Sequence, residues 1–196
     1  MKDLAVDACC LINLLAAGAI LPPPAVSMGK GMAARRTPSA SPLEAILHVP
    51  AVVARESLYL LRPDDDQTKL VKSPIDLTPY FAQGVLCECE IEGEVETGLF
   101  VQYATILDDG EAACLAIARQ RGWTLATDDR PAAALAGRAN VPVVSTAQLV
   151  KHWAKRANAS KQQVAAVLAN IRRFAKFVPR PNSPEASWWF SHHRQK

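Results

Sequence analysis

Short apolar stretches that end in an acid or a proline and lead into a helix are the feature that most limits this chain's fold. The strand predicted over residues 4–6 ends at Asp7, and residues 8–15 then have the apolar spacing of a helix, with Gly18 as its stop. A second unit begins with the strand predicted over residues 46–49. Alternating strands and helices predict an α/β fold with a parallel sheet and right-handed crossovers.

The rest of the first 150 residues continues this alternation. Pro50 opens a helix predicted over residues 51–61, and residues 85–91 alternate apolar and acidic side chains, as a half-exposed strand does. Asp108 is predicted to cap the helix over residues 109–121. The other predicted elements are helices near 77–83, over 93–106 and from Pro131 onward, and strands over 123–127 and 141–144.

Charge and composition divide the chain into two parts. Residues 1–150 carry 12 Lys/Arg against 18 Asp/Glu, a balance of −6, whereas residues 151–196 carry 10 against one, a balance of +9. We therefore predict an α/β domain over 1–150 and a basic helical extension over 151–196 that meets an anion. A solvated helix face is the other interpretation of these charges. Residues 22–42, rich in Pro, Gly, Ser and Ala, are predicted to be an insertion in the domain.

The cysteines and the N-terminal apolar run bear on the compartment. Five cysteines, two of them adjacent, do not suggest a disulfide framework, so a reduced cytoplasmic compartment is expected. The apolar run over residues 8–21 is too short to span a bilayer. Asp3 and Asp7 argue against a signal peptide. We interpret the run as a buried helix and expect no membrane partner.

Acidic residues recur where the predicted strands end. Asp7 and the pair Asp128 and Asp129 follow strands, and Glu56 and Glu111 lie on helices. Because parallel strands end at one rim of a sheet, these acids would converge there. Clustered carboxylates repel one another, and binding of Mg²⁺ or Mn²⁺ relieves that repulsion. Metal ions held by carboxylates are typical of enzymes that hydrolyse phosphodiester bonds. Each acid alone has an ordinary explanation, such as a helix cap at Asp7.

Four motifs in order resemble the PIN-domain family, most closely the VapC-type toxin ribonucleases of toxin–antitoxin pairs. They are Val6–Leu15, His48–Glu56, Leu107–Ala113 and Leu125–Arg130, within a resemblance that covers residues 3–150. The resemblance implies a three-layer α/β/α fold with a central parallel sheet. It also implies a Mg²⁺- or Mn²⁺-dependent ribonuclease, a homodimer and inhibition by a cognate antitoxin.

The resemblance also assigns residues by position. Catalysis and metal binding would fall to Asp7, Glu56 and Glu111, with Asp128 or Asp129 as the fourth acid. Asn13 either hydrogen-bonds near the site or ties helical segments together, and Thr127 either orients metal-bound water or fills a strand position.

This chain departs from the family pattern at three places. Ala8 and Cys9 stand where the family commonly has Ser or Thr, Glu111 is one methylene longer than the usual Asp, and the 22–42 insertion separates the first two motifs.

The basic extension has its own pattern. Ser160 begins a helix predicted over residues 160–178, whose apolar stripe comprises Val164, Val167, Leu168, Ile171, Phe174 and Val178. Arg172, Arg173 and Lys176 lie off this stripe and would bind RNA or a protein partner. The aromatic run over residues 188–190 would dock onto the domain, stack on bases or bind a partner.

Three functions follow from these observations. The first is a metal-dependent endoribonuclease, the toxin of a type II toxin–antitoxin pair. The second is a PIN-like RNA- or protein-binding module with weak or no nuclease activity, because the hydroxyl after Asp7 is missing. The third, a phosphoacceptor signalling domain, fits less well: it needs paired acids after the first strand and a lysine after the last, where this chain has Ser145 and Thr146.

Overall fold

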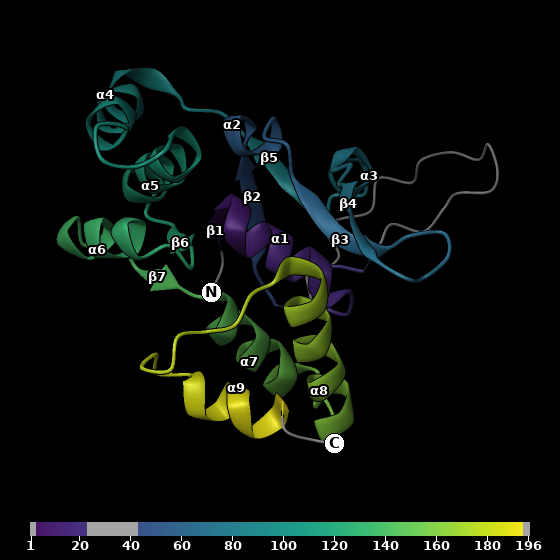
Figure 1. The fold of residues 1–196 in the computed structure, drawn as a ribbon. Helices are drawn as coiled ribbons and strands as arrows, with labels where there is room; N and C mark the ends of the chain where they lie inside the picture. The colour runs from purple at the N-terminus through teal and green to yellow at the C-terminus, as the bar shows by residue number, and fades with distance from the viewer. Residues whose placement is uncertain (1–2, 23–42, 194–196) are drawn as a thin grey trace.

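Five parallel strands form the central sheet, in the order β5-β2-β1-β6-β7 (Figure 1). The computed structural model describes residues 3–22 and 43–193. The strands are β1 (Asp3–Val6), β2 (Ile46–Pro50), β5 (Cys87–Cys89), β6 (Thr124–Ala126) and β7 (Val143–Val144). Because β1 pairs with both β2 and β6, Asp7 leaves the sheet in the middle of its carboxyl-end rim.

Helices cover both faces of the sheet and confirm the predicted three-layer α/β/α fold (Figure 1). On one face α5 packs against β1, β2 and β6, with α4 and α6 beside it, and on the other α1 packs with α7 and α8. The helices are α1 (Ala8–Ala17), α4 (Gly93–Tyr103), α5 (Asp109–Arg121), α6 (Arg130–Arg138), α7 (Thr146–Arg156) and α8 (Lys161–Asn170).

The central strand and α5 are buried because their side chains are apolar or small. Residues 4–6 of β1 are fully buried, as expected for a parallel sheet covered on both faces. Four alanines and one cysteine of α5 are also buried, and these small side chains let the helix approach the strands closely. The predicted ends of α5 are confirmed: the Asp108 side chain accepts a hydrogen bond from the Glu111 N–H, and Gly122 closes the helix at φ +68°.

The helix predicted over residues 51–61 is wrong. The chain forms only α2 (Ala51–Ala54), turns, and then enters strand β3 (Tyr59–Pro63). β3 pairs antiparallel with β4 (Leu70–Pro74), ahead of the short helix α3 (Thr78–Ala82). Leu58 and Leu60 are buried while Tyr59 is exposed, which is the alternation of a strand. The strand that pairs with β3 lies further along the chain, so the helix-like spacing of apolar residues around residue 55 predicted the wrong element.

The helix predicted over residues 160–178 is shorter than expected. α8 ends at Asn170 and a five-residue π-helix, η1 (Ile171–Ala175), follows it, with Lys176 in a left-handed conformation at φ +57°. The start of the predicted stripe is buried, but Val178 is 42% exposed. The wider π-turn shifts the later residues off the buried face.

The C-terminal extension packs onto the α/β domain. α7, which the sequence analysis did not predict, begins with a capping box between Ser145 and Gln148. α9 (Ala186–His193) packs against α8 and buries Trp189 completely. The Phe177 ring meets the Trp189 ring edge-on, with 5.7 Å between centroids. Trp189 is therefore buried within the extension, against α8 and Phe177, and is not free to stack on bases; docking of the run onto residues 1–150 stays a prediction.

Two further expectations concern the chain as a whole. The predicted insertion over residues 22–42 lies, apart from Pro22, outside the described residues. Within the part of the chain that the structure describes, every helix is too short or too polar to cross a bilayer.

Trp189→Ala is expected to lower the free energy of unfolding by about 3–5 kcal/mol, because it removes a fully buried indole and leaves a cavity. That corresponds to a fall of roughly 10 °C in Tm, measured by thermal denaturation. Trp188→Ala is the matched control, since Trp188 is half-buried. Equal losses for the two variants would contradict the docked position of Trp189.

Candidate active site

Five acidic side chains from four separate points of the chain meet at the carboxyl-end rim of the sheet. Asp7 follows β1, Glu56 follows α2, Asp108 and Glu111 begin α5, and Asp129 begins α6. Burial, and then the charges of Asp108 and Asp7, raise the pKa of Glu56. Burial, and then the charges of Asp108, Asp129 and Asp7, raise the pKa of Glu111. The predicted convergence of Asp7, Glu56, Glu111 and one acid of the 128–129 pair is therefore present.

Asp7 is held in place by side chains rather than used as a helix cap. It is 4% exposed, and its carboxylate Oδ2 accepts hydrogen bonds from Thr127 Oγ1 at 2.7 Å and Cys9 Sγ at 3.0 Å. Its side chain makes no capping hydrogen bond to α1. Burial, and then the charge of Asp108, raise the pKa of Asp7 above its ordinary value.

Glu56 reaches the cluster by a different route from the one predicted. It is exposed in the bend after α2, not on a helix face. Its carboxylate lies over Gly110, where an added Cβ would collide with Glu56 Oε1. Glycine at position 110 therefore leaves the space that Glu56 occupies at the start of α5.

Glu111 and Asp108 share the first turn of α5. Burial, and then the charges of Asp108, Asp129 and Asp7, raise the pKa of Glu111 to about 7. Sequence reasoning treated Asp108 only as a cap, and it does cap α5, at 2.8 Å from the Glu111 N–H. Sequence reasoning missed that Asp108 lies close to the other acids. Its position in the same sequence motif as Glu111 could have indicated this.

The structure separates the two acids that the sequence left undecided. Asp128 turns inward: its Oδ1 accepts from the Thr146 N–H at 3.0 Å, and its Oδ2 from Thr146 Oγ1 at 2.5 Å and Asn13 Nδ2 at 3.0 Å. Asp129 instead caps α6 by accepting from the Ala132 N–H at 2.8 Å, and its charge acts on Glu111. Asp129 therefore belongs to the acid cluster, and Asp128 ties β6 to α1 and α7.

The two expected supporting residues have defined partners. Asn13 donates to Asp128 and to Thr146 Oγ1, which matches the interpretation that it ties helical segments together. Thr127 donates to Asp7 and accepts from the Asp129 N–H at 3.0 Å, so it bridges two of the clustered acids.

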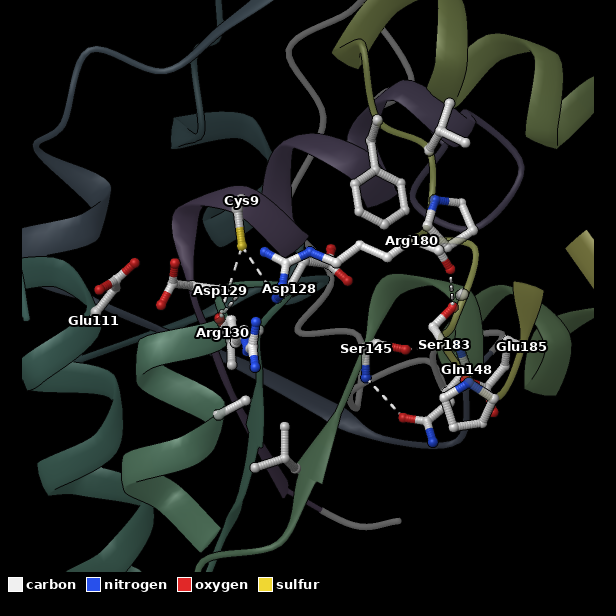
Figure 2. A pocket seen from close by; sticks show the side chains of 18 residues that line it. Cys9, Glu111, Asp128, Asp129, Arg130, Ser145, Gln148, Arg180, Ser183 and Glu185 are labelled. Atoms are coloured by element: carbon white, nitrogen blue, oxygen red, sulfur yellow. Dashed lines mark hydrogen bonds between the residues drawn. The ribbon is translucent and has the colours of Figure 1, made fainter.

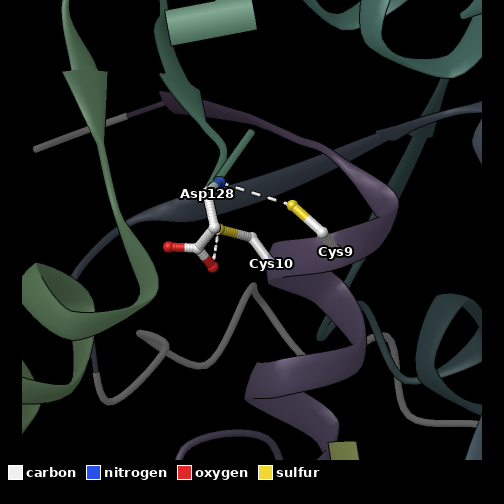
Figure 3. A group of neighbouring side chains, drawn as sticks. All are labelled: Cys9, Cys10 and Asp128. Carbon is white, nitrogen blue, oxygen red and sulfur yellow. Dashed lines mark hydrogen bonds between the residues drawn. The ribbon is translucent and has the colours of Figure 1, made fainter. Parts of the chain in front are cut away.

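Cys9, Cys10 and Asp128 form a second group of donor atoms beside the cluster (Figure 3). Their donor atoms lie within 4.8 Å of one another, close enough to hold a metal ion. However, Cys10 is fully buried, which raises the pKa of its thiol well above the ordinary value, and Asp128 is already hydrogen-bonded to Asn13 and Thr146. This group is better explained by its internal hydrogen bonds.

The acid cluster itself fits a hard divalent cation. Its donors are carboxylate oxygens, the ligands that Mg²⁺ and Mn²⁺ prefer. In the described residues, no lysine or arginine forms an ion pair with Asp7, Glu56, Glu111 or Asp129. Burial, and then the charges of neighbouring acids, raise the pKa values of the first three.

A pocket of about 540 Å³ opens beside the cluster (Figure 2). One side consists of residues at the start of α1, after β6, in β7 and at the starts of α5, α6 and α7. The other side is the segment 177–185 that precedes α9. Its charged lining residues are Glu111, Asp128, Asp129, Arg130, Arg180 and Glu185. Glu111 and Asp129 of the cluster thus face a cavity of the size that small ligands occupy.

Stability without metal ions should fall as the pH rises. Between about pH 4.5 and 7 the folded protein keeps a proton on Glu111 that the unfolded chain has lost, so the free energy of unfolding decreases across this range. Asp7 and Glu56 shift in the same direction. Melts in EDTA from about pH 5 to about pH 7.5 should show Tm falling, and Glu111→Gln should flatten the fall. A Tm independent of pH in both proteins would contradict the electrostatic coupling.

The comparison with known families gives an independent result. A family model described as a PIN domain matches residues 47–181, more than half of the chain. No curated protein and no solved structure matches significantly. The matched residues include α2, α5 and β6, which bring Glu56, Glu111 and Asp129 to the rim, and they extend through α7 and α8. The resemblance drawn from the sequence is thus confirmed at the level of the family: this chain belongs to the PIN-domain family.

Proposed function

We propose that this protein is a metal-dependent endoribonuclease that hydrolyses RNA phosphodiester bonds. The observation that carries the proposal is the cluster of Asp7, Glu56, Glu111 and Asp129, which forms no ion pair with a lysine or arginine among residues 3–22 and 43–193. Two of these acids, Glu111 and Asp129, line a pocket. PIN domains are generally nucleases, and the chain's nuclease-type fold supports the same activity.

The four acids would hold Mg²⁺ or Mn²⁺ at the carboxyl-end rim. When bound, the ion activates water and stabilises the charge that builds on the phosphate. Thr127 and Cys9 hold the Asp7 carboxylate in one orientation through their hydrogen bonds to Oδ2. Such fixed orientation of ligands preserves metal affinity and activity. Asp129 is the fourth acid in this proposal, because Asp128 is engaged with Asn13 and Thr146.

The RNA would extend from the pocket onto the basic extension. Arg172, Arg173 and Lys176 are exposed at η1, directly before the segment 177–185 that lines the pocket. Contacts between such side chains and phosphates strengthen binding without regard to sequence. By resemblance to the VapC-type members of the family, we further propose that the protein is the cytoplasmic toxin of a type II toxin–antitoxin pair. It would form a homodimer and bind a cognate antitoxin.

The direct test is cleavage of structured RNAs by the purified protein. Products are expected with Mg²⁺ or Mn²⁺ and none in EDTA, as resolved on denaturing gels. Asp7→Ala is the control for contaminating nucleases, because it removes an acid from the centre of the cluster. Cleavage that persists in EDTA, or in the Asp7→Ala protein, would contradict the proposal.

The alternative is a PIN-like RNA- or protein-binding module with weak activity or none. It is favoured by one observation: the thiol of Cys9, rather than a hydroxyl, donates to Asp7. In that case millimolar Mn²⁺ would raise Tm without RNA turnover. At a free Mn²⁺ concentration of 100 times Kd, binding adds about 2.7 kcal/mol to the free energy of unfolding. Cleavage gained by Cys9→Ser would trace the defect to the thiol.

A further inference from the structure

Arg180 lies in the wall of the pocket opposite the acid cluster. It belongs to the segment 177–185, whereas Glu111 and Asp129 lie at the starts of α5 and α6. Figure 2 shows the Arg180 side chain extending from this segment into the pocket, on the side of Asp128. The extension therefore brings a positive charge to the cavity that the acids border.

The chain around Arg180 is fixed by its neighbours. Ser183 donates two hydrogen bonds to the Arg180 carbonyl oxygen, from its N–H at 3.0 Å and its hydroxyl at 2.8 Å. Pro179 and Pro181 flank the arginine and restrict the backbone. Phe177 packs against the buried Trp189. Because the backbone is already ordered, a ligand that binds Arg180 loses little entropy in positioning it.

Arg180 is not used as a partner for the acids near it. Across residues 3–22 and 43–193, no ion pair joins it to Glu111, Asp129 or Glu185, although all four line the same pocket. By contrast, Arg121 is paired with the buried Glu96 at 2.7 Å. A guanidinium that lacks a carboxylate partner keeps its planar set of donors available for an oxyanion, and phosphate matches that geometry.

The pocket has a second cation on the side of the acids. Arg130 is the first residue of α6, directly after Asp129, and its side chain also lines the cavity. A phosphate group is repelled by carboxylates, so it needs positive charge on its other sides. Arg130 and Arg180 supply that charge from two different elements of the fold.

We propose that Arg180 is a substrate-binding residue that holds a phosphate of the RNA strand in this pocket. The C-terminal extension then forms one wall of the nuclease site rather than only a remote basic surface. This inference rests on the proposed ribonuclease function and names the group that Arg180 recognises, the RNA phosphate. It adds to Arg172, Arg173 and Lys176 a residue whose contact is next to the acids.

RNA binding without cleavage tests the inference. The Asp7→Asn protein is titrated into a fluorescein-labelled single-stranded RNA oligonucleotide, and anisotropy is followed at several salt concentrations. Adding Arg180→Gln is expected to raise Kd about tenfold, as for loss of a charge-assisted hydrogen bond, and to reduce the salt slope by about one. The Kd of the Arg180→Lys protein should lie between those of the proteins with Arg180 and with Arg180→Gln, because lysine keeps the charge but lacks the planar guanidinium.

Arg138→Gln is the matched control. Arg138 is exposed at the other end of α6, outside the pocket, and the change removes the same charge. Equal RNA affinities for the Arg180→Gln and Arg138→Gln proteins would overturn the inference. The inference would also be overturned if, in the protein that keeps Asp7, Arg180→Gln cleaved RNA faster than the unmodified protein does, since the guanidinium would then block the acids. A protein with intact Asp7 that neither cleaves nor binds RNA would instead overturn the proposed function itself.

Discussion

Asp7→Asn is expected to abolish RNA cleavage, with a loss of at least about a hundredfold in rate, while leaving the protein folded. Mutation of groups that only orient metal ligands costs 10- to 100-fold in comparable sites, so loss of a ligand's charge should cost more. The amide oxygen of asparagine still accepts the hydrogen bonds from Thr127 and Cys9, so the shape of the site is kept. The measurement is the initial rate on an RNA that the unmodified protein cleaves in Mg²⁺ or Mn²⁺.

The same change has a second, opposite effect on stability. The pKa of Asp7 is raised in the folded protein, which means that its ionised form opposes folding when no metal ion is present. Asp7→Asn should therefore melt no lower than the unmodified protein near neutral pH in EDTA. A fall of several degrees would make Asp7 a structural residue and would leave the loss of cleavage uninformative.

Glu88→Gln is the control for removing a carboxylate from this sheet. Glu88 is exposed on the edge strand β5, away from the pocket. Its change should alter neither the cleavage rate nor Tm. If Glu88→Gln were as damaging as Asp7→Asn, the acids assigned to the site would be the wrong ones.

The adjacent acids Asp128 and Asp129 should respond in opposite ways to substitution. Asp129→Asn is expected to lose cleavage and keep its fold, because asparagine caps helices as well as aspartate does. Asp128→Ala is expected to lose about 3 kcal/mol of stability, since it leaves Asn13 and Thr146 without their acceptor. That loss corresponds to roughly 6–12 °C in Tm.

Cleavage by the Asp128→Ala protein, measured well below its Tm, should persist. Thermal denaturation and initial rates on the same preparations separate the two effects. An Asp128→Ala protein that melts normally but does not cleave RNA would exchange the roles assigned to the two residues.

The fold was predictable because its signals are local. Each unit of the parallel sheet shows in the sequence as an apolar stretch, a turn residue and a helix, as at Asp7 and Asp108. The helix expected over residues 51–61 failed because β3 depends on its pairing with β4 further along the chain. The spacing of nearby residues contains no information about that pairing.

The site was predictable in its chemistry but not in its orientation. Acids at strand ends were sufficient to expect a cluster, but the choice between Asp128 and Asp129 depends on Thr146, which lies in α7. Arg180 was missed for a similar reason. It reaches the pocket only because α8, η1 and α9 fold the extension back onto the domain.

The position of the segment 177–185 has a consequence for the order in which the protein becomes functional during synthesis. Ribosomes make a chain from its N-terminus, so all the clustered acids, from Asp7 to Asp129, emerge before the wall that completes their pocket. Trp189, which supports that wall through Phe177, is made later still. A nascent chain would thus hold its acids without the complete pocket until the residues through Trp189 have been made. For the proposed ribonuclease, made in the presence of the ribosome's own RNA, that delay would separate production of the protein from its activity.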